Sequence, residues 1–285
     1  MENIDVFESV FKRALRTPFE YERKAIERVL LVTDLEPEPL KEFESKAKDF
    51  LKGLGGPAPR WTSVGGSEYS RWKELKALIA KADPSLIVAY RLLQEVHENA
   101  KFSLGAYLDT MAQESEVPLL VLPNPDGYLS GGKAFAGLNS VMVVTDHLSG
   151  EHKLVSAGAR FTAQGGMLHL CHLEDEDIFD RYLRTIAKIP EINTDTARER
   201  IREQLLDEPR AYLESVIKVL REKRPDLKVE TVVEIGQVVS RYRALVGRRQ
   251  VDLLVFDSKD KSQLAMHSAG YSLAVEFKDT PLLLV

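Results

Sequence analysis

Short runs of apolar residues recur along the chain, and a stretch with helical spacing or turn residues separates most runs from the next. Such runs are typical of parallel strands that helices cover on both faces. The strands expected from them are residues 28–34, 60–65, 85–90, 117–123, 140–146, 167–174, 227–236, 251–257 and 280–285.

The intervening stretches have start and stop signals of helices, with proline, serine or threonine near their beginnings and glycine after their ends. The helices expected from them are residues 36–54, 67–82, 102–115, 150–164, 175–189, 194–223, 237–247 and 268–277, with Ser67 capping the second and Thr194 or Asp195 capping the sixth. Strands that alternate with helices predict right-handed βαβ crossovers and a parallel sheet covered on both faces.

Three of the apolar runs occur twice, in the same order. VLLVTD (29–34) matches VMVVTD (141–146), SLIVAY (85–90) matches DLLVFD (252–257), and VPLLVLP (117–123) matches TPLLLV (280–285). Three matches in order indicate an internal duplication. The first half has no clear counterpart of residues 167–174 or of the charged region after them, so we expect it to be abbreviated by about one βα step.

The duplication predicts two domains of the flavodoxin-like, doubly wound class in tandem. Residues 1–124 form the first, which includes a helical extension over about residues 1–27, and residues 140–285 form the second. Between them, residues 125–139 are rich in glycine, proline and asparagine, which is typical of a linker. The extension has apolar residues at helical spacing. They form one helix face, which we expect either to pack on the body of the protein or to bind a partner.

Composition narrows the function further. The 285 residues are 44% hydrophobic and 29% charged, with a formal net charge of -5, so a dedicated nucleic-acid binder is not expected. The single cysteine, Cys171, excludes an intrachain disulfide and fits a reducing compartment. No apolar run is long enough to span a bilayer, and the first residues lack the apolar stretch of a signal peptide. We therefore expect a soluble cytoplasmic protein.

The repeated runs resemble those of the universal stress protein family, across residues 141–285 and, with a gap, residues 28–123. The resemblance implies a five-stranded flavodoxin-like sheet in each complete unit and a tandem, two-domain arrangement. It also implies that residues 117–122 and 281–285 pair antiparallel at an internal two-fold axis. Such a pseudo-dimer permits a monomer, and a homodimer is left open.

Some members of that family bind ATP through a motif spaced Gly-x2-Gly-x9-Gly-Ser/Thr. The glycines let backbone N–H groups approach phosphate oxygens, and the hydroxyl adds a donor at a helix start. Both halves depart from this motif. In the first half the early glycines are absent, and Gly105-Ala106 lies at the Gly-Ser position. In the second half Ser268-Ala269 lies at the Gly-Ser position. The candidate nucleotide-binding residues are Thr33, Asp34, Gly105, Ala106, Thr145, Asp146, Asp257, Ser258, Ser268 and Ala269.

The sequence gives no strong signal for a metal site or for catalytic residues. His169, Cys171 and His172 lie close together, but only the first two share a strand face, which is too few for a metal site. No Walker A motif and no Gly-x-Ser-x-Gly elbow are present, and no catalytic residue is assigned.

The expected function is that of a stress-associated regulatory protein that acts through a protein partner of unknown identity, with a degenerate nucleotide pocket. The alternative is a slow ATP hydrolase, or a sensor that binds ATP or AMP at the clefts beside the strand-end aspartates. A third hypothesis is a purely structural pair of domains without a ligand.

Overall fold

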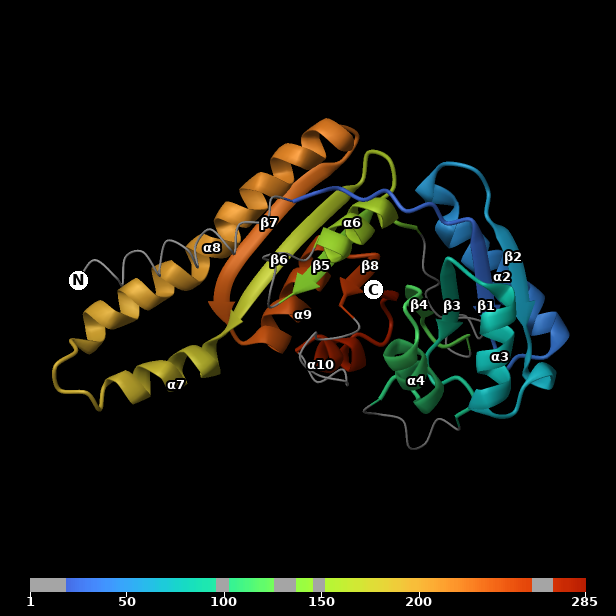
Figure 1. The fold of residues 1–285 in the computed structure, drawn as a ribbon, viewed down its shortest axis with the longest axis horizontal. Coiled ribbons are helices and arrows are strands. Elements are labelled where there is room, and N and C mark those ends of the chain that lie inside the picture. Colours follow the sequence, from blue (N-terminus) through green and yellow to red (C-terminus); the bar gives the residue numbers. More distant parts are fainter. Residues whose placement is uncertain (1–18, 96–102, 126–136, 146–151, 258–268) are drawn as a thin grey trace.

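A computed structural model describes residues 19–95, 103–125, 137–145, 152–257 and 269–285 (Figure 1). The strands are β1 Arg28–Val32, β2 Arg60–Val64, β3 Leu86–Tyr90, β4 Leu119–Leu122, β5 Ser140–Thr145, β6 Met167–Asp175, β7 Lys228–Gly236, β8 Leu253–Phe256 and β9 Leu282–Leu284. The helices are α2 Pro37–Leu51, α3 Trp72–Ala82, α4 Ala106–Glu114, α6 His152–Phe161, α7 Glu176–Ile186, α8 Thr194–Lys223, α9 Val238–Arg249 and α10 Ala269–Glu276, with two 3-10 turns, η1 Lys52–Leu54 and η2 Gly66–Glu68.

The nine strands of the described residues join one continuous sheet, in the order β2-β1-β3-β4-β9-β8-β5-β6-β7. Neighbouring strands are parallel except at the centre, where β4 and β9 run antiparallel with Leu120 opposite Leu283. The antiparallel pairing that the resemblance implied is therefore confirmed. It places the carboxyl ends of the strands of the two halves at opposite edges of the sheet.

The strand order divides the sheet into two flavodoxin-like units in tandem. The C-terminal unit, β7-β6-β5-β8-β9, has the doubly wound order 3-2-1-4-5, and the N-terminal unit, β2-β1-β3-β4, has the same order without the outermost strand. The expected abbreviation by one βα step is confirmed, but the missing step was placed wrongly. β2 pairs with β1 as β6 pairs with β5, so the absent strand is the counterpart of β7.

Helices on both faces bury the inner strands. All residues of β3, β4, β8 and β9 are buried, as expected of two-sided parallel strands. The units also touch through their helices, since the Tyr271 hydroxyl of α10 lies 3.3 Å from the Asp109 carboxylate of α4. On the other side Arg160 of α6 donates to the carbonyl of Leu54, at 2.9 Å. None of the described helices is long and apolar enough to cross a membrane.

Both predicted helix caps differ from those in the structure. Ser67 lies in η2, and α3 begins at Trp72. The cap of α8 is Asn193, whose Oδ1 accepts from the Thr196 N–H at 2.9 Å. Several residues near each start have capping chemistry, and the periodic pattern alone does not choose between them.

The segment before β1 crosses α6 and has no regular secondary structure from residue 19 to residue 27. Phe19 is buried, and its ring lies 5.6 Å from that of His152. The Glu20 N–H donates to His152 Nδ1 and the Glu22 N–H to Ser156 Oγ, both at 3.1 Å. The predicted helical extension therefore does not include residues 19–27. Its earlier part lies outside the described residues, as does most of the predicted linker.

Candidate functional site

The first candidate residue, Thr33, lies at the carboxyl edge of the N-terminal unit, directly after β1. Its side chain is buried, and both its N–H and its hydroxyl donate to the Val64 carbonyl, at 2.9 and 3.2 Å. Its own carbonyl accepts from the Tyr69 hydroxyl at 3.0 Å. Thr33 therefore fastens β1 to β2 and to the segment before α3.

Asp34 reaches from the end of β1 to the loop between β3 and α4. Its Oδ2 accepts from the Gln94 N–H at 2.7 Å, and its own N–H donates to the Tyr90 hydroxyl at 3.2 Å. Gln94 has a left-handed φ of 63°, a conformation in which a hydrogen bond from its N–H helps to hold the loop. Asp34 therefore has the role of a strand-end aspartate that organises the adjacent turn.

Gly105 and Ala106 lie at the start of α4, where the resemblance places them. Gly105 has φ 112°, and a Cβ there would lie 3.1 Å from the Cα of Leu92, so glycine is required. Ala106 is the first residue of the helix, and its N–H donates to the Oε1 of Glu95 at 2.5 Å.

Glu95 therefore supplies an anion to the N-terminus of α4. That end of a helix attracts negative charge because its first N–H groups are unpaired and its dipole is positive there. In an ATP-binding unit this is the position for a phosphate; here a carboxylate of the same chain occupies it. The sequence prediction missed Glu95, because the spacing in the loop does not indicate which side chain folds back.

The same loop also crosses to the other unit. Arg91, one of the side chains that replace the early glycines, is 4% exposed, and its Nη2 donates to the carbonyls of Ala274 and Phe277, both at 2.6 Å. These carbonyls lie at the C-terminal end of α10, where a cation is favourable. Burial lowers the pKa of Arg91 to about 10. The loop that would cradle phosphates thus holds the two units together.

The second candidate position can be described only in part. The backbone of Thr145 pairs with His172 at the end of β5, Asp257 directly follows β8, and Ala269 begins α10. Asp146, Ser258 and Ser268 lie outside the described residues, so the geometry available for a nucleotide site belongs to the N-terminal unit.

A serine, a histidine and a carboxylate meet at the opposite, amino edge of the C-terminal unit. Ser140 Oγ lies 3.1 Å from His169 Nε2, and His169 Nδ1 lies 2.9 Å from Glu230 Oε2. Arg249 binds both oxygens of Glu230. The N–H of Ser140 donates to Asp252 at 2.9 Å, so it is not available to stabilise an oxyanion. The network fits a structural role, and the expected satisfied core histidine is confirmed for His169.

The neighbouring groups do not form a metal or thiol site either. Within the part of the chain that the structure describes, no three His, Cys, Asp or Glu side chains converge to hold a metal ion. Cys171 is fully buried, and burial raises the pKa of its thiol to about 12. A thiol that stays protonated is a poor nucleophile.

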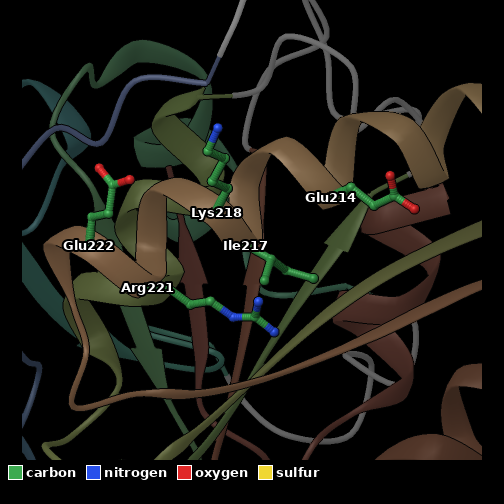
Figure 2. A pocket seen from close by; sticks show the side chains of 5 residues that line it. All are labelled: Glu214, Ile217, Lys218, Arg221 and Glu222. Carbon is green, nitrogen blue, oxygen red and sulfur yellow. The ribbon is translucent and has the colours of Figure 1, made fainter.

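The hollow on α8, among those formed by the described residues, does not have the form of a nucleotide pocket. This hollow, of about 460 Å³, is lined among the described residues only by α8, and Figure 2 shows these side chains: Glu214, Ile217, Lys218, Arg221 and Glu222. Another, of about 340 Å³, lies between α3 and the strands β1 and β2. A ligand site needs an enclosed apolar cleft with a few converging polar groups, and the α8 surface offers one helix face with mixed charges.

Comparison with known proteins identifies the fold. No family model matches the sequence, and no curated protein is significantly similar to it. Two solved structures from Pseudomonas aeruginosa superpose with a TM-score of 0.50: a protein of unknown function (11% identity, 92% of each chain) and a provisionally assigned universal stress protein (12% identity, 92% of this chain and 93% of that one). A universal stress protein from Archaeoglobus fulgidus has 14% identity, a TM-score of 0.49, and coverage of 90% and 95%. At such identities the likeness concerns the fold alone: the chain has a universal-stress-protein-like fold.

Proposed function

We propose that this chain is a regulatory binding protein of the universal stress type, which acts through contacts with another protein rather than by turning over ATP. The observation that carries the proposal is the hydrogen bond from the Ala106 N–H to Glu95, at 2.5 Å. A side chain of the protein itself occupies the position at which a family member would hold a phosphate. The fold supports the assignment to the universal stress type.

Electrostatics supports the same conclusion. A triphosphate at this edge would have to displace the Glu95 carboxylate from α4 and approach the carboxylate of Asp34, which follows β1 and accepts from the neighbouring Gln94 N–H. A hydrogen bond to a charged group contributes about 1.5–3 kcal/mol, so displacement alone weakens binding by roughly tenfold to a hundredfold. Repulsion between the remaining carboxylate and the phosphates adds to this cost.

The organisation of the chain fits a binding role as well. We propose domain boundaries at residue 124 and residue 140, between β4, the last strand of the N-terminal unit along the chain, and β5, the first strand of the C-terminal unit. Because Arg91 and the β4–β9 pairing join the two units, we expect them to offer a shared surface to a partner.

Isothermal titration of the purified chain with ATP and AMP tests the proposal, after native mass spectrometry has checked for co-purified nucleotide. We expect no bound nucleotide and no binding heat at micromolar ligand. Micromolar binding that Asp146→Ala abolishes would assign a nucleotide site to the C-terminal unit and favour a sensor. Phosphate release from ATP that the same variant abolishes would favour the slow hydrolase. Either result contradicts the proposal.

A further inference from the structure

The edge strand of the N-terminal unit has an unpaired side. β2 ends the sheet there, whereas its counterpart β6 has β7 on its outer side (Figure 1). The Arg60 N–H and the Val64 carbonyl bond inward, to the chain of β1, at 2.8 and 2.9 Å. Because backbone groups alternate in direction along a strand, those of Trp61 and Ser63 point outward. No strand of the described residues pairs with them, and such a row of groups can pair with another strand.

Side chains of opposite charge flank the two ends of β2 on the face that α2 covers. Near the start of the strand, Lys48 Nζ lies 5.5 Å from the ring centre of Trp61. Near its end, the Ser63 hydroxyl donates to the Glu44 carboxylate at 2.7 Å. This face of the edge is therefore basic towards the start of β2 and acidic towards its end.

The face that α3 covers has the same polarity. Arg60, Thr62 and Glu68 line a hollow of about 340 Å³ beside the strand, and Arg60 and Thr62 are exposed. Arg60 begins β2, and its guanidinium forms no ion pair with a described residue. Glu68 lies beyond the end of β2, where its carboxylate accepts from the Gly65 N–H at 2.8 Å. A basic start and an acidic end thus recur on both faces of the edge.

We propose that β2 pairs antiparallel with β2 of a second copy of this chain, about a two-fold axis at Thr62. Trp61 of each copy then exchanges two backbone hydrogen bonds with Ser63 of the other copy. Every contact occurs twice, as a two-fold interface requires. The pairing joins the sheets of the two copies into one.

Charge complementarity identifies the occupant of the edge as a second copy. An antiparallel copy reverses the polarity of the edge, so each basic start faces an acidic end. Within one chain Lys48 already pairs with Glu44, and across the axis the two ion pairs form a ring of alternating charges. On the other face, Arg60 of each copy lies opposite Val64 of the other copy, within reach of its Glu68.

The residues that flank β2 select the register. A pairing centred on Trp61 would oppose Ser63 to Pro59, which has no N–H to donate. A pairing centred on Ser63 would oppose Trp61 to Gly65, whose N–H is already bonded to Glu68. In the register centred on Thr62, every outward N–H and carbonyl of β2 has a partner.

This interface differs from the strand pairing at the centre of the sheet. β4 and β9 already pair with each other within one chain, so that edge is not available to a second copy. A pair of five-residue strands buries less surface than a standard interface, and we therefore expect a weak dimer that dissociates on dilution. The inference is independent of whether either unit binds a nucleotide.

Sedimentation equilibrium of the full chain, from low to high micromolar concentration, tests the proposal. We expect a monomer–dimer equilibrium for the wild type and a monomer throughout for Ser63→Pro, which removes an outward N–H and leaves the inward bonds of β2 in place. Ser63→Ala is the matched control: it removes the hydroxyl, keeps the N–H and should still dimerise. A wild type that stays monomeric, or a folded Ser63→Pro that dimerises like Ser63→Ala, would overturn the proposal.

A cysteine at the axis tests the register without depending on the proline variant. The axis places Thr62 opposite itself in a non-hydrogen-bonded pair, with Cα atoms about 4.5 Å apart, a separation that a disulfide can span. Under mild oxidation Thr62→Cys should therefore form a covalent dimer, whereas Ser45→Cys, at an exposed position of α2, should not. Cys171 is fully buried in both variants. Equal cross-linking of the two variants would contradict the register.

A charge reversal tests the antiparallel orientation. Arg60→Glu brings a carboxylate beside Glu68 of the other copy and should raise the dissociation constant at least about tenfold. Lys73→Glu makes the same change at an exposed position of α3 outside the hollow and should have little effect. Circular dichroism establishes that the variants fold. Dissociation constants that rise equally in both would show that net charge, and not the facing of Arg60 and Glu68, governs the dimer.

Discussion

Arg91 of the N-terminal unit donates a hydrogen bond of 2.6 Å to the carbonyl of Phe277 in the C-terminal unit, and a second bond of the same length goes to Ala274. The arginine lies just after β3, in the loop where a nucleotide-binding unit would have glycines. Arg91 therefore clamps the loop after β3 to the C-terminal end of α10. It adds to the β4–β9 strand pairing that joins the two units in one sheet.

Replacing Arg91 with methionine should destabilise the protein. The carbonyls of Ala274 and Phe277 would lose the charged donor that satisfies them, and we expect the free energy of unfolding to fall by about 2–4 kcal/mol. Urea denaturation followed by circular dichroism measures this change. Arg91→Lys should recover only part of it, because an ammonium group has a different donor geometry. Equal stability of Arg91→Met and the wild type would show that the clamp is energetically neutral.

Glu95→Ala should remove the side-chain cap of α4. Loss of an N-terminal cap costs about 1 kcal/mol. Inorganic phosphate should then raise the melting temperature of the variant more than that of the wild type, because the vacated Ala106 N–H can donate a hydrogen bond to an anion. Thermal unfolding with and without phosphate, at constant ionic strength, measures the difference. An identical phosphate effect on both proteins would contradict the role of Glu95.

Gly105→Ala should destabilise the protein by about 1–3 kcal/mol, because alanine at φ 112° is strained and its Cβ would press on the backbone of Leu92. Gly236→Ala is the matched control: its added Cβ meets no atom within 4 Å and no left-handed φ is required. Chemical denaturation of both variants measures the contrast. If both lose the same stability, Gly105 has no special conformational role.

The His169 network should make stability depend on pH. Burial lowers the pKa of His169 below the usual value for histidine, about 6.5, although the neighbouring Glu230 acts in the opposite direction. Below about pH 6.5 the unfolded chain therefore takes up a proton that the folded protein resists. The stabilisation is complete above that pH and decreases as the pH falls towards the lowered pKa.

Unfolding free energies at about pH 7 and about pH 5 measure this effect. The decrease should be steeper for the wild type than for His169→Gln, in which Glu230, Arg249 and Ser140 still surround the position. A decrease of the same size in both proteins would assign the pH dependence to carboxylates elsewhere.

Most strands and the order of the units were predictable because buried parallel strands leave continuous apolar runs. The weakest strand signal was β2, an edge strand with exposed Arg60 and partly exposed Trp61, and its weakness led to the wrong position for the missing step. Asp34 was identified from the repeat. Arg91 and Glu95 were not assigned their roles, because their partners depend on how the loop folds and how the units pack.

The most direct test of the central claim is a calorimetric titration of the wild-type chain with ATP. The account predicts no binding heat at micromolar ATP, because Glu95 binds the N-terminus of α4 and the Asp34 carboxylate repels phosphates nearby. Micromolar binding that Asp34→Ala abolishes would place ATP in the N-terminal pocket and contradict the account.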